Sequence, residues 1–127
     1  MRYTLLLHYP EMTAEDLGPE ALAEGMRAFD VYDKALDAAG VLRSAEVLQP
    51  STATTILTLA GGELVVQDGP FADLKERLGG TFVIEVPDLD VALEWARQAP
   101  SAHYGHVEIR PSATRFTDGA WTGEPQL

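Results

Sequence analysis

The sequence of 127 residues contains no cysteine. Disulfide bonds, thiolate nucleophiles and cysteine-ligated zinc or iron–sulfur centres are therefore excluded. Long apolar runs are also missing, because none approaches the ~18 residues that a membrane-spanning helix needs. The opening segment MRYTLLLHYP has no small-residue cleavage site behind its short apolar run, so it is expected to be a strand rather than a signal peptide. We therefore expect a cytoplasmic protein.

Positive charge is scarce. Nine Lys and Arg residues stand against 20 Asp and Glu residues, which gives a net charge of −11 with neutral histidines. A surface this acidic repels nucleic-acid phosphates and anionic lipid heads, so direct binding to nucleic acid or membrane is not expected. Most of these charges are expected to form a solvated, solubilising surface.

Apolar periodicity predicts strands and helices in alternation. The expected strands cover residues 2–9, 41–50, the two halves of 52–67 joined at Gly61-Gly62, 79–86 and 105–111. The expected helices cover residues 19–40 and 88–100, capped by Gly40 and Asp88 respectively, and residues 11–20 are expected to be a loop. The inward faces of the helices are expected to carry Leu22, Met26, Phe29, Tyr32, Leu36 and Ala39, and Leu89, Ala92, Leu93, Trp95 and Ala96.

The predicted order β-α-β-(hairpin)-β-α-β indicates an α+β fold of the ferredoxin-like split βαβ type with an inserted β-hairpin. Both helices then cover the same face of the sheet. The other face needs a cover, and a face-to-face homodimer provides one. The domain is expected to span residues 1–111, and residues 112–127 to form a C-terminal tail or an extra hairpin.

The segment VVQDGPFADLKERLGG contains a rigid corner at residues 68–70. Glycine there permits a positive φ, proline fixes the next residue, and Asp68 is placed to accept hydrogen bonds from nearby amides. Phe71 is then expected to enter the core. The residues after it are expected to form a short helical turn with an ion pair between Asp73 and Arg77.

This segment, continuing through FVIEVPDLDVALEWA to HYGHVEIRP, resembles the DGPF-type branch of the YCII-related family. Members typically read DGPFAETKEQLGG, then a strand, a DLDEALEWA-like helix and GxVEVRP. The likeness also includes AAGVL after the first helix and LQPSTATT before the hairpin, and it extends from Met1 to Pro111.

The resemblance implies a small ferredoxin-like protein that dimerises into an α/β barrel-like assembly. Some relatives in the wider superfamily are lyase-like enzymes acting on small aromatic compounds, and genes of the DGPF branch often lie beside extracytoplasmic-function sigma factors. Two departures stand out. Asp73-Leu74 replaces the usual Glu-Thr, and Phe29 occupies the position where the narrower YCII group carries a histidine of a proposed His–Asp pair.

Strand alternation places four polar residues on the sheet face away from the helices. His8 ends the first strand and His106 begins the last, so antiparallel pairing brings them together, and Glu108 and Arg110 follow on the same face. Either histidine is a candidate general base, and Arg110 is a candidate for holding a carboxylate or phenolate. Glu108 is a further candidate binding residue in the same polar cluster. The alternative is that these groups only form hydrogen bonds across a dimer interface.

The corner segment supplies three further candidates. Asp68 is a candidate catalytic residue or a structural cap. Because the corner precedes the 79–86 strand, we expect Asp68 at the end of the sheet opposite His8, so that only a partner subunit brings the two together. Lys75 and Glu76 are candidate ligand-binding residues, or else solvated charges.

Familiar cofactor motifs are absent from the sequence, and we expect no cofactor and no resident metal. His103, His106 and Glu108 form the one alternative, an irregular zinc or iron site without a recognised ligand spacing.

The sequence thus predicts a homodimer that binds a small, aromatic or acidic molecule at its interface, with acid/base chemistry of the lyase or isomerase type. The alternative is a regulatory or ligand-sensing dimer without enzymatic activity, associated with extracytoplasmic-function sigma factor systems. A purely structural partner is the third possibility, and it requires a large apolar surface that stays exposed after dimerisation.

Overall fold

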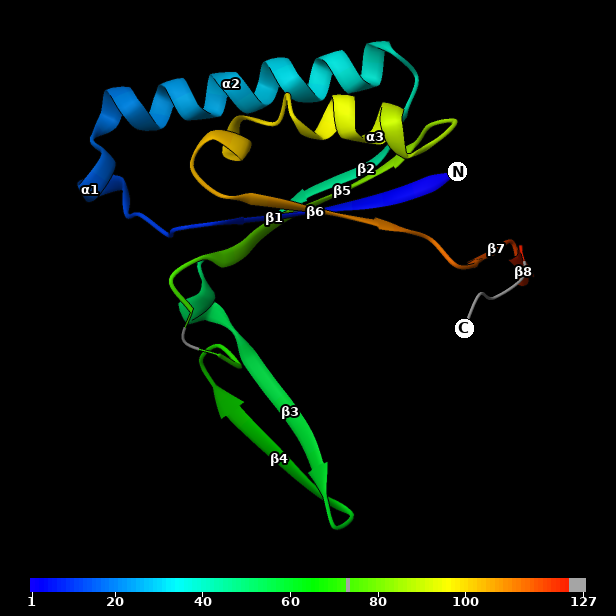
Figure 1. The fold of residues 1–127 in the computed structure, drawn as a ribbon. Coiled ribbons are helices and arrows are strands. Elements are labelled where there is room, and N and C mark those ends of the chain that lie inside the picture. The colour runs from blue at the N-terminus through cyan, green and yellow to red at the C-terminus, as the bar shows by residue number, and fades with distance from the viewer. Residues whose placement is uncertain (73, 124–127) are drawn as a thin grey trace.

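The computed structural model describes residues 1–72 and 74–123 (Figure 1). Its helices are α1 (Ala14–Leu17), α2 (Pro19–Ala38) and α3 (Leu89–Ala96), with short 3-10 helices at Ser51–Ala53 and Pro100–His103. Its strands are β1 (Arg2–Tyr9), β2 (Leu42–Val47), β3 (Thr55–Ala60), β4 (Glu63–Asp68), β5 (Arg77–Glu85), β6 (His106–Pro111), β7 (Arg115–Thr117) and β8 (Ala120–Thr122). Within these ranges, no helix has both the length and the apolar character needed to cross a membrane.

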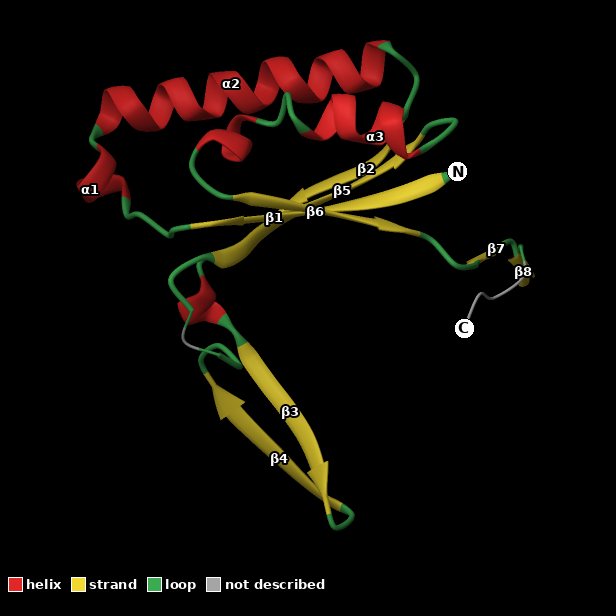
Figure 2. Ribbon diagram, viewed as in Figure 1, coloured by secondary structure: helices red, strands yellow, loops and turns green. Residues whose placement is uncertain are grey.

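Four strands form the main sheet in the order β2-β5-β1-β6, and every neighbouring pair is antiparallel. Helices α2 and α3 lie together on one face of this sheet, and the other face is left without a helix (Figure 2). The result is a mixed α+β architecture that is consistent with a ferredoxin-like fold.

The core lies between the sheet and the two helices. Alternation along β1 buries Tyr3, Leu5 and Leu7 on the helix-covered side and leaves the residues between them on the open side, as the sequence predicts. The remaining large core residues are Tyr32, Leu36, Phe82, Ile84 and Val86.

Both longer helices begin at the expected signals, and α2 also ends at one, whereas α3 ends at Ala96 and not at the expected residue 100. Pro19 occupies the first turn of α2, and Asp88 caps α3 by accepting a hydrogen bond from the Val91 amide at 3.0 Å. Gly40 follows α2 with φ +74°, and the Val41 amide donates back to the Leu36 carbonyl. This is a Schellman ending, which requires a left-handed residue at that point.

Several expectations for the helices are wrong. Residues 11–20 are not only loop, because Thr13 caps the short helix α1. Leu22 and Met26 of α2 are exposed, and so are Leu89 and Leu93 of α3. Helical spacing identifies the apolar side of a helix but not how closely that side approaches the sheet.

The hairpin of β3 and β4 projects from the sheet on the side away from the helices, and we call residues 55–68 the arm (Figure 1). Phe71, which follows the arm, is 91% exposed, so its expected place in the core is wrong. The chain leaves the corner away from the body and re-enters it only at β5, which begins at Arg77. The expected helical turn is absent from the described residues here, and its ion pair with Asp73 lies outside them.

The C-terminal residues form a second small hairpin. Strands β7 and β8 pair with each other, and Phe116 packs edge-on against Trp121 with ring centroids 5.1 Å apart. Both rings are exposed.

Candidate functional site

The predicted histidines meet on the open face of the sheet. His8 of β1 pairs directly with His106 of β6, which confirms the expected register. His8 Nε2 lies 2.5 Å from Glu108 Oε1, an ion-pair contact without hydrogen-bond geometry. His106 Nδ1 lies 2.8 Å from Glu76 Oε1. When the ring is protonated, Nδ1 donates a charge-assisted hydrogen bond to this oxygen. The open face therefore carries two adjacent histidine–carboxylate pairs.

The second of these pairs affects titration. The hydrogen bond that His106 donates to Glu76, and then the negative charge of Glu76, raise the pKa of His106 above the ordinary histidine value of 6.5. The His106 ring is largely exposed, whereas Glu76 is mostly covered. The positively charged imidazolium, which can donate a proton, therefore persists to a higher pH than in an isolated histidine.

The other predicted residues lie apart from these pairs. Arg110 stands opposite Thr4 on the open face and is exposed. Lys75 is exposed ahead of β5, and Asp68 is exposed at the end of β4, opposite Thr55. Among the described residues, no hydrogen bond or ion pair links Asp68 to either histidine.

The expected position of the corner segment is wrong. Strands β1 and β5 run antiparallel, so His8 pairs with Leu78 and the end of β1 lies beside the start of β5. The segment that follows the corner therefore arrives at the histidine end of the sheet, not at the opposite end. Its last residue before β5 is Glu76, which binds His106 directly.

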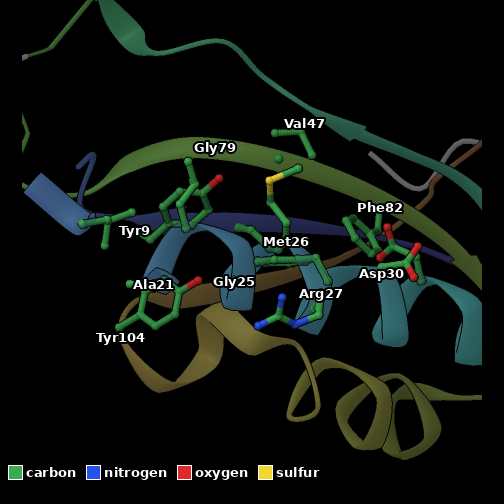
Figure 3. A pocket seen from close by; sticks show the side chains of 16 residues that line it. Tyr9, Ala21, Gly25, Met26, Arg27, Asp30, Val47, Gly79, Phe82 and Tyr104 are labelled. Carbon is green, nitrogen blue, oxygen red and sulfur yellow. The ribbon is translucent and has the colours of Figure 1, made fainter. Parts of the chain in front are cut away.

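A cavity lies on the other side of the sheet. We call this hollow, of about 720 Å³, the α2 groove (Figure 3). Apolar side chains from helix and sheet form most of its walls: Leu22, Met26 and Phe29 from α2, and Leu7, Val47 and Phe82 from the strands. Met26 and Val47 are 67% and 79% exposed, so the groove opens to solvent between α2 and the edge strand β2.

Helix lengths explain why the groove exists. The 20 residues of α2 extend about 30 Å, whereas the eight of α3 extend about 12 Å. Helix α3 packs beside the C-terminal half of α2, where the Tyr32 hydroxyl donates to the Trp95 carbonyl at 2.8 Å (Figure 1). Helix α3 is therefore too short to run along the whole of α2, and Gly79 and Gly80 of β5 are among the residues that line the groove.

Titratable groups line the same groove. Asp33 Oδ1 is buried and has no hydrogen-bond partner among the described residues. Burial, and then the nearby charge of Asp30, raise the pKa of the Asp33 carboxyl. Tyr9 and Tyr104 meet edge-on at the far end with centroids 6.1 Å apart, and burial raises the pKa of each phenol. A carboxyl group with an unfilled hydrogen bond in an apolar hollow is typical of a binding or catalytic site.

Arg27 supplies positive charge to this groove. Its side chain lies along the α2 wall near Asp30 (Figure 3). No described residue forms an ion pair or hydrogen bond with the Arg27 guanidinium, whereas Asp30 is already bound to Lys34 at 2.7 Å. The groove therefore combines apolar walls with an unpaired cation at its rim.

Sequence reasoning assigned this side of α2 to the core and missed the groove. The signal was present: Arg27, Asp30 and Asp33 recur every three residues beside the apolar stripe, which puts charge next to the helix face that should be buried. Phe29 also lies in the groove.

The part of the chain that the structure describes contains no cluster of metal ligands. Across residues 1–72 and 74–123, no three His, Asp or Glu side chains come close enough together to hold a metal ion.

Comparison with known proteins places these features in a family context. The YCII-related domain matches residues 1–114. An uncharacterised protein of Rhizobium meliloti (strain 1021) is 35% identical over 115 residues, which covers 89% of this chain and 93% of that protein.

Proposed function

This chain belongs to the YCII-related domain family, and from that premise we propose that it binds a small acidic molecule with an aromatic or other apolar body in the α2 groove. The cavity itself carries the proposal. Its volume of about 720 Å³ falls in the range of ~300–1,000 Å³ found for small-molecule sites.

The chemistry of the walls supports this ligand class. Phe29 and Met26 offer apolar surface for a ring, and Arg27 offers a guanidinium that has no partner among the described residues. A guanidinium binds a carboxylate or phenolate through charge-assisted hydrogen bonds. Asp33 has an unfilled hydrogen-bonding position, which suits a hydroxyl or amine on the ligand.

The anionic naphthalene dye 8-anilinonaphthalene-1-sulfonate is a suitable probe, followed through glycine amide signals in NMR spectra. Gly25, Gly79 and Gly80 line the groove, whereas Gly61 and Gly62 lie at the tip of the arm. We expect saturable shifts in the first three and none in the other two. Shifts confined to the arm would contradict the proposal.

Two variants test the details. Gly25→Phe fills the groove and is expected to abolish the shifts, whereas Ala35→Phe, on an exposed part of the same helix, is expected to preserve them. Arg27→Gln is expected to weaken dye binding roughly tenfold, the equivalent of ~1.4 kcal/mol for one charge-assisted hydrogen bond. The neutral analogue N-phenyl-1-naphthylamine is expected to bind both forms equally, because it has no charge for Arg27 to recognise.

A second candidate function follows from the open face. The histidine–carboxylate pairs support acid/base chemistry by His8 and His106, with Asp68 as a third catalytic residue and Glu108, Arg110, Lys75 and Glu76 as binding residues in a pocket that a homodimer closes. Ligand-induced shifts of the histidine ring protons, with the groove glycines unchanged, would favour this site over the groove.

Assignment to the DGPF branch rests on the Asp68–Phe71 motif. Membership of that branch would favour the alternative function, a regulatory or ligand-sensing dimer associated with extracytoplasmic-function sigma factors. Recovery of a bound ligand unchanged after long incubation would favour sensing. Conversion of the ligand would favour a lyase- or isomerase-like enzyme.

A further inference from the structure

The arm exposes an apolar face. Strands β3 and β4 pair Leu57 with Val66 and Leu59 with Leu64, which puts all four side chains on one side of the hairpin. Their exposed fractions are 61%, 54%, 69% and 60% in that order. The opposite side of the arm is mixed, with Thr58 and Gln67 among its residues.

The rest of the chain does not cover this face. Within the described residues, β3 and β4 pair with each other and make no extended contact with other elements. A two-stranded hairpin alone is at best marginally stable in water, and an exposed apolar face of this kind marks a site of association. The base of the arm is nevertheless fixed, because Glu11 accepts hydrogen bonds from the amide and hydroxyl of Ser51 at 2.6 and 2.7 Å.

We infer that a second copy of this chain covers the arm, and that each arm clasps the opposite protomer. The arm projects on the same side as the helix-free face of the main sheet, so one partner can cover both surfaces (Figure 2). A two-fold contact of this kind repeats the same patch on both partners, and a patch of aliphatic side chains is complementary to itself.

The charges on the open face permit such an approach despite the net charge of −11. Arg2 and Arg43 both approach Glu85, at 3.6 and 2.9 Å, and each histidine there has its own carboxylate. Two copies that meet through this face therefore bring together charges that are already largely paired. A nucleic acid or an anionic lipid surface, in contrast, is repelled by the acidic remainder of the molecule.

Area also favours a partner that contacts both surfaces. Strands spaced about 4.8 Å apart with a rise of about 3.3 Å per residue give the four-stranded face roughly 400 Å² and the arm roughly 200 Å² in projection. Stable interfaces bury about 800 Å² per partner. The sheet alone supplies about half of that area, and the arm raises the total to about three-quarters of it.

The test compares two aspartates on opposite sides of the arm. Sedimentation equilibrium should show that the unaltered chain dimerises. Leu59→Asp is expected to weaken the dimer at least tenfold, which is the loss expected when a central anchor of an interface is removed. Thr58→Asp is expected to leave the dimer unchanged. Near-ultraviolet circular dichroism checks that both variants keep the folded body, which makes no extended contact with the arm. A monomer at high concentration would overturn the inference, and so would equal dimerisation of the two variants.

A second measurement uses the absence of native thiols. An environment-sensitive fluorophore on the single cysteine of Leu59→Cys is expected to shift to the blue as protein concentration rises through the dimerisation range, and the same label on Thr58→Cys is expected to respond little. A label at Leu59 that stays solvent-exposed in a proven dimer would place the interface elsewhere and refute the role of the arm. Neither result depends on whether the α2 groove binds a ligand.

Discussion

Gly25 offers a direct test of the space beneath α2. It lies inside the longest helix, it is exposed, and a Cβ added there meets no atom within 4 Å. Glycine inside a helix is less favourable than alanine by about 0.8–1.0 kcal/mol, because it loses more backbone freedom on folding. Gly25→Ala is therefore expected to stabilise the protein by about 1 kcal/mol, with no packing cost to offset the gain.

For a domain of 127 residues this gain corresponds to a rise in Tm of roughly 3–5 °C. In urea it corresponds to an increase of about 0.5 M in the unfolding midpoint, at an unchanged slope of roughly 2 kcal/mol per M. Ala35→Gly is the matched control, since Ala35 is exposed in the same helix, and it is expected to shift both quantities by the same amount in the opposite direction.

A destabilised Gly25→Ala protein would refute the reasoning. It would mean that the added methyl group meets an occupied region, so that the groove is closed in solution. If Gly25→Ala stabilised the protein but Ala35→Gly did not destabilise it, the effect at Gly25 would have a cause other than helix propensity.

Two further outcomes concern titration. Glu76→Gln is expected to lower the pKa of His106 toward 6.5, as measured from the ring protons by NMR. In the unaltered protein that pKa is raised in the folded state. The stabilisation from this pair is therefore present below pH 6.5 and is lost as pH rises through the raised value. A His106 titration that the substitution leaves unchanged would contradict the pairing. Asp33→Asn is expected to remove a trend of the same sign at lower pH. Burial raises the pKa of the Asp33 carboxyl above 3.8, so the free energy of unfolding of the unaltered protein should fall as pH rises from about 4 through the raised value. The variant should lose this contribution. Parallel stability curves for the two proteins over that range would refute it.

The sequence predicted best what depends on local alternation and on sheet topology. The period of two along β1 identified the buried side chains, and antiparallel pairing of the first and last strands placed His8 beside His106. Both inferences need only neighbouring residues and the order of the strands.

Features that depend on distances between elements were not predictable in this way. Met26 has helical spacing suited to a core, but α3 is too short to accompany the first half of α2, so the stripe lines a groove. Phe71 follows a corner whose turn chemistry is local, while the direction of the chain after that corner is set by the arm. The site groups Arg27 and Asp33 were missed for the same reason, since their role follows from the space that α2 leaves open.

The position of β1 between β5 and β6 has a consequence for biosynthesis. The strand made first is also the one that two late strands must flank, and Leu5 finds its partners only at Phe82 and Ile109. During translation the nascent N-terminal segment therefore emerges long before its hydrogen-bonding neighbours exist, and loop closure over most of the chain must precede a complete sheet. A complete sheet therefore forms only after β6 has been synthesised, and until then the apolar side chains of β1 lack the strands that flank them.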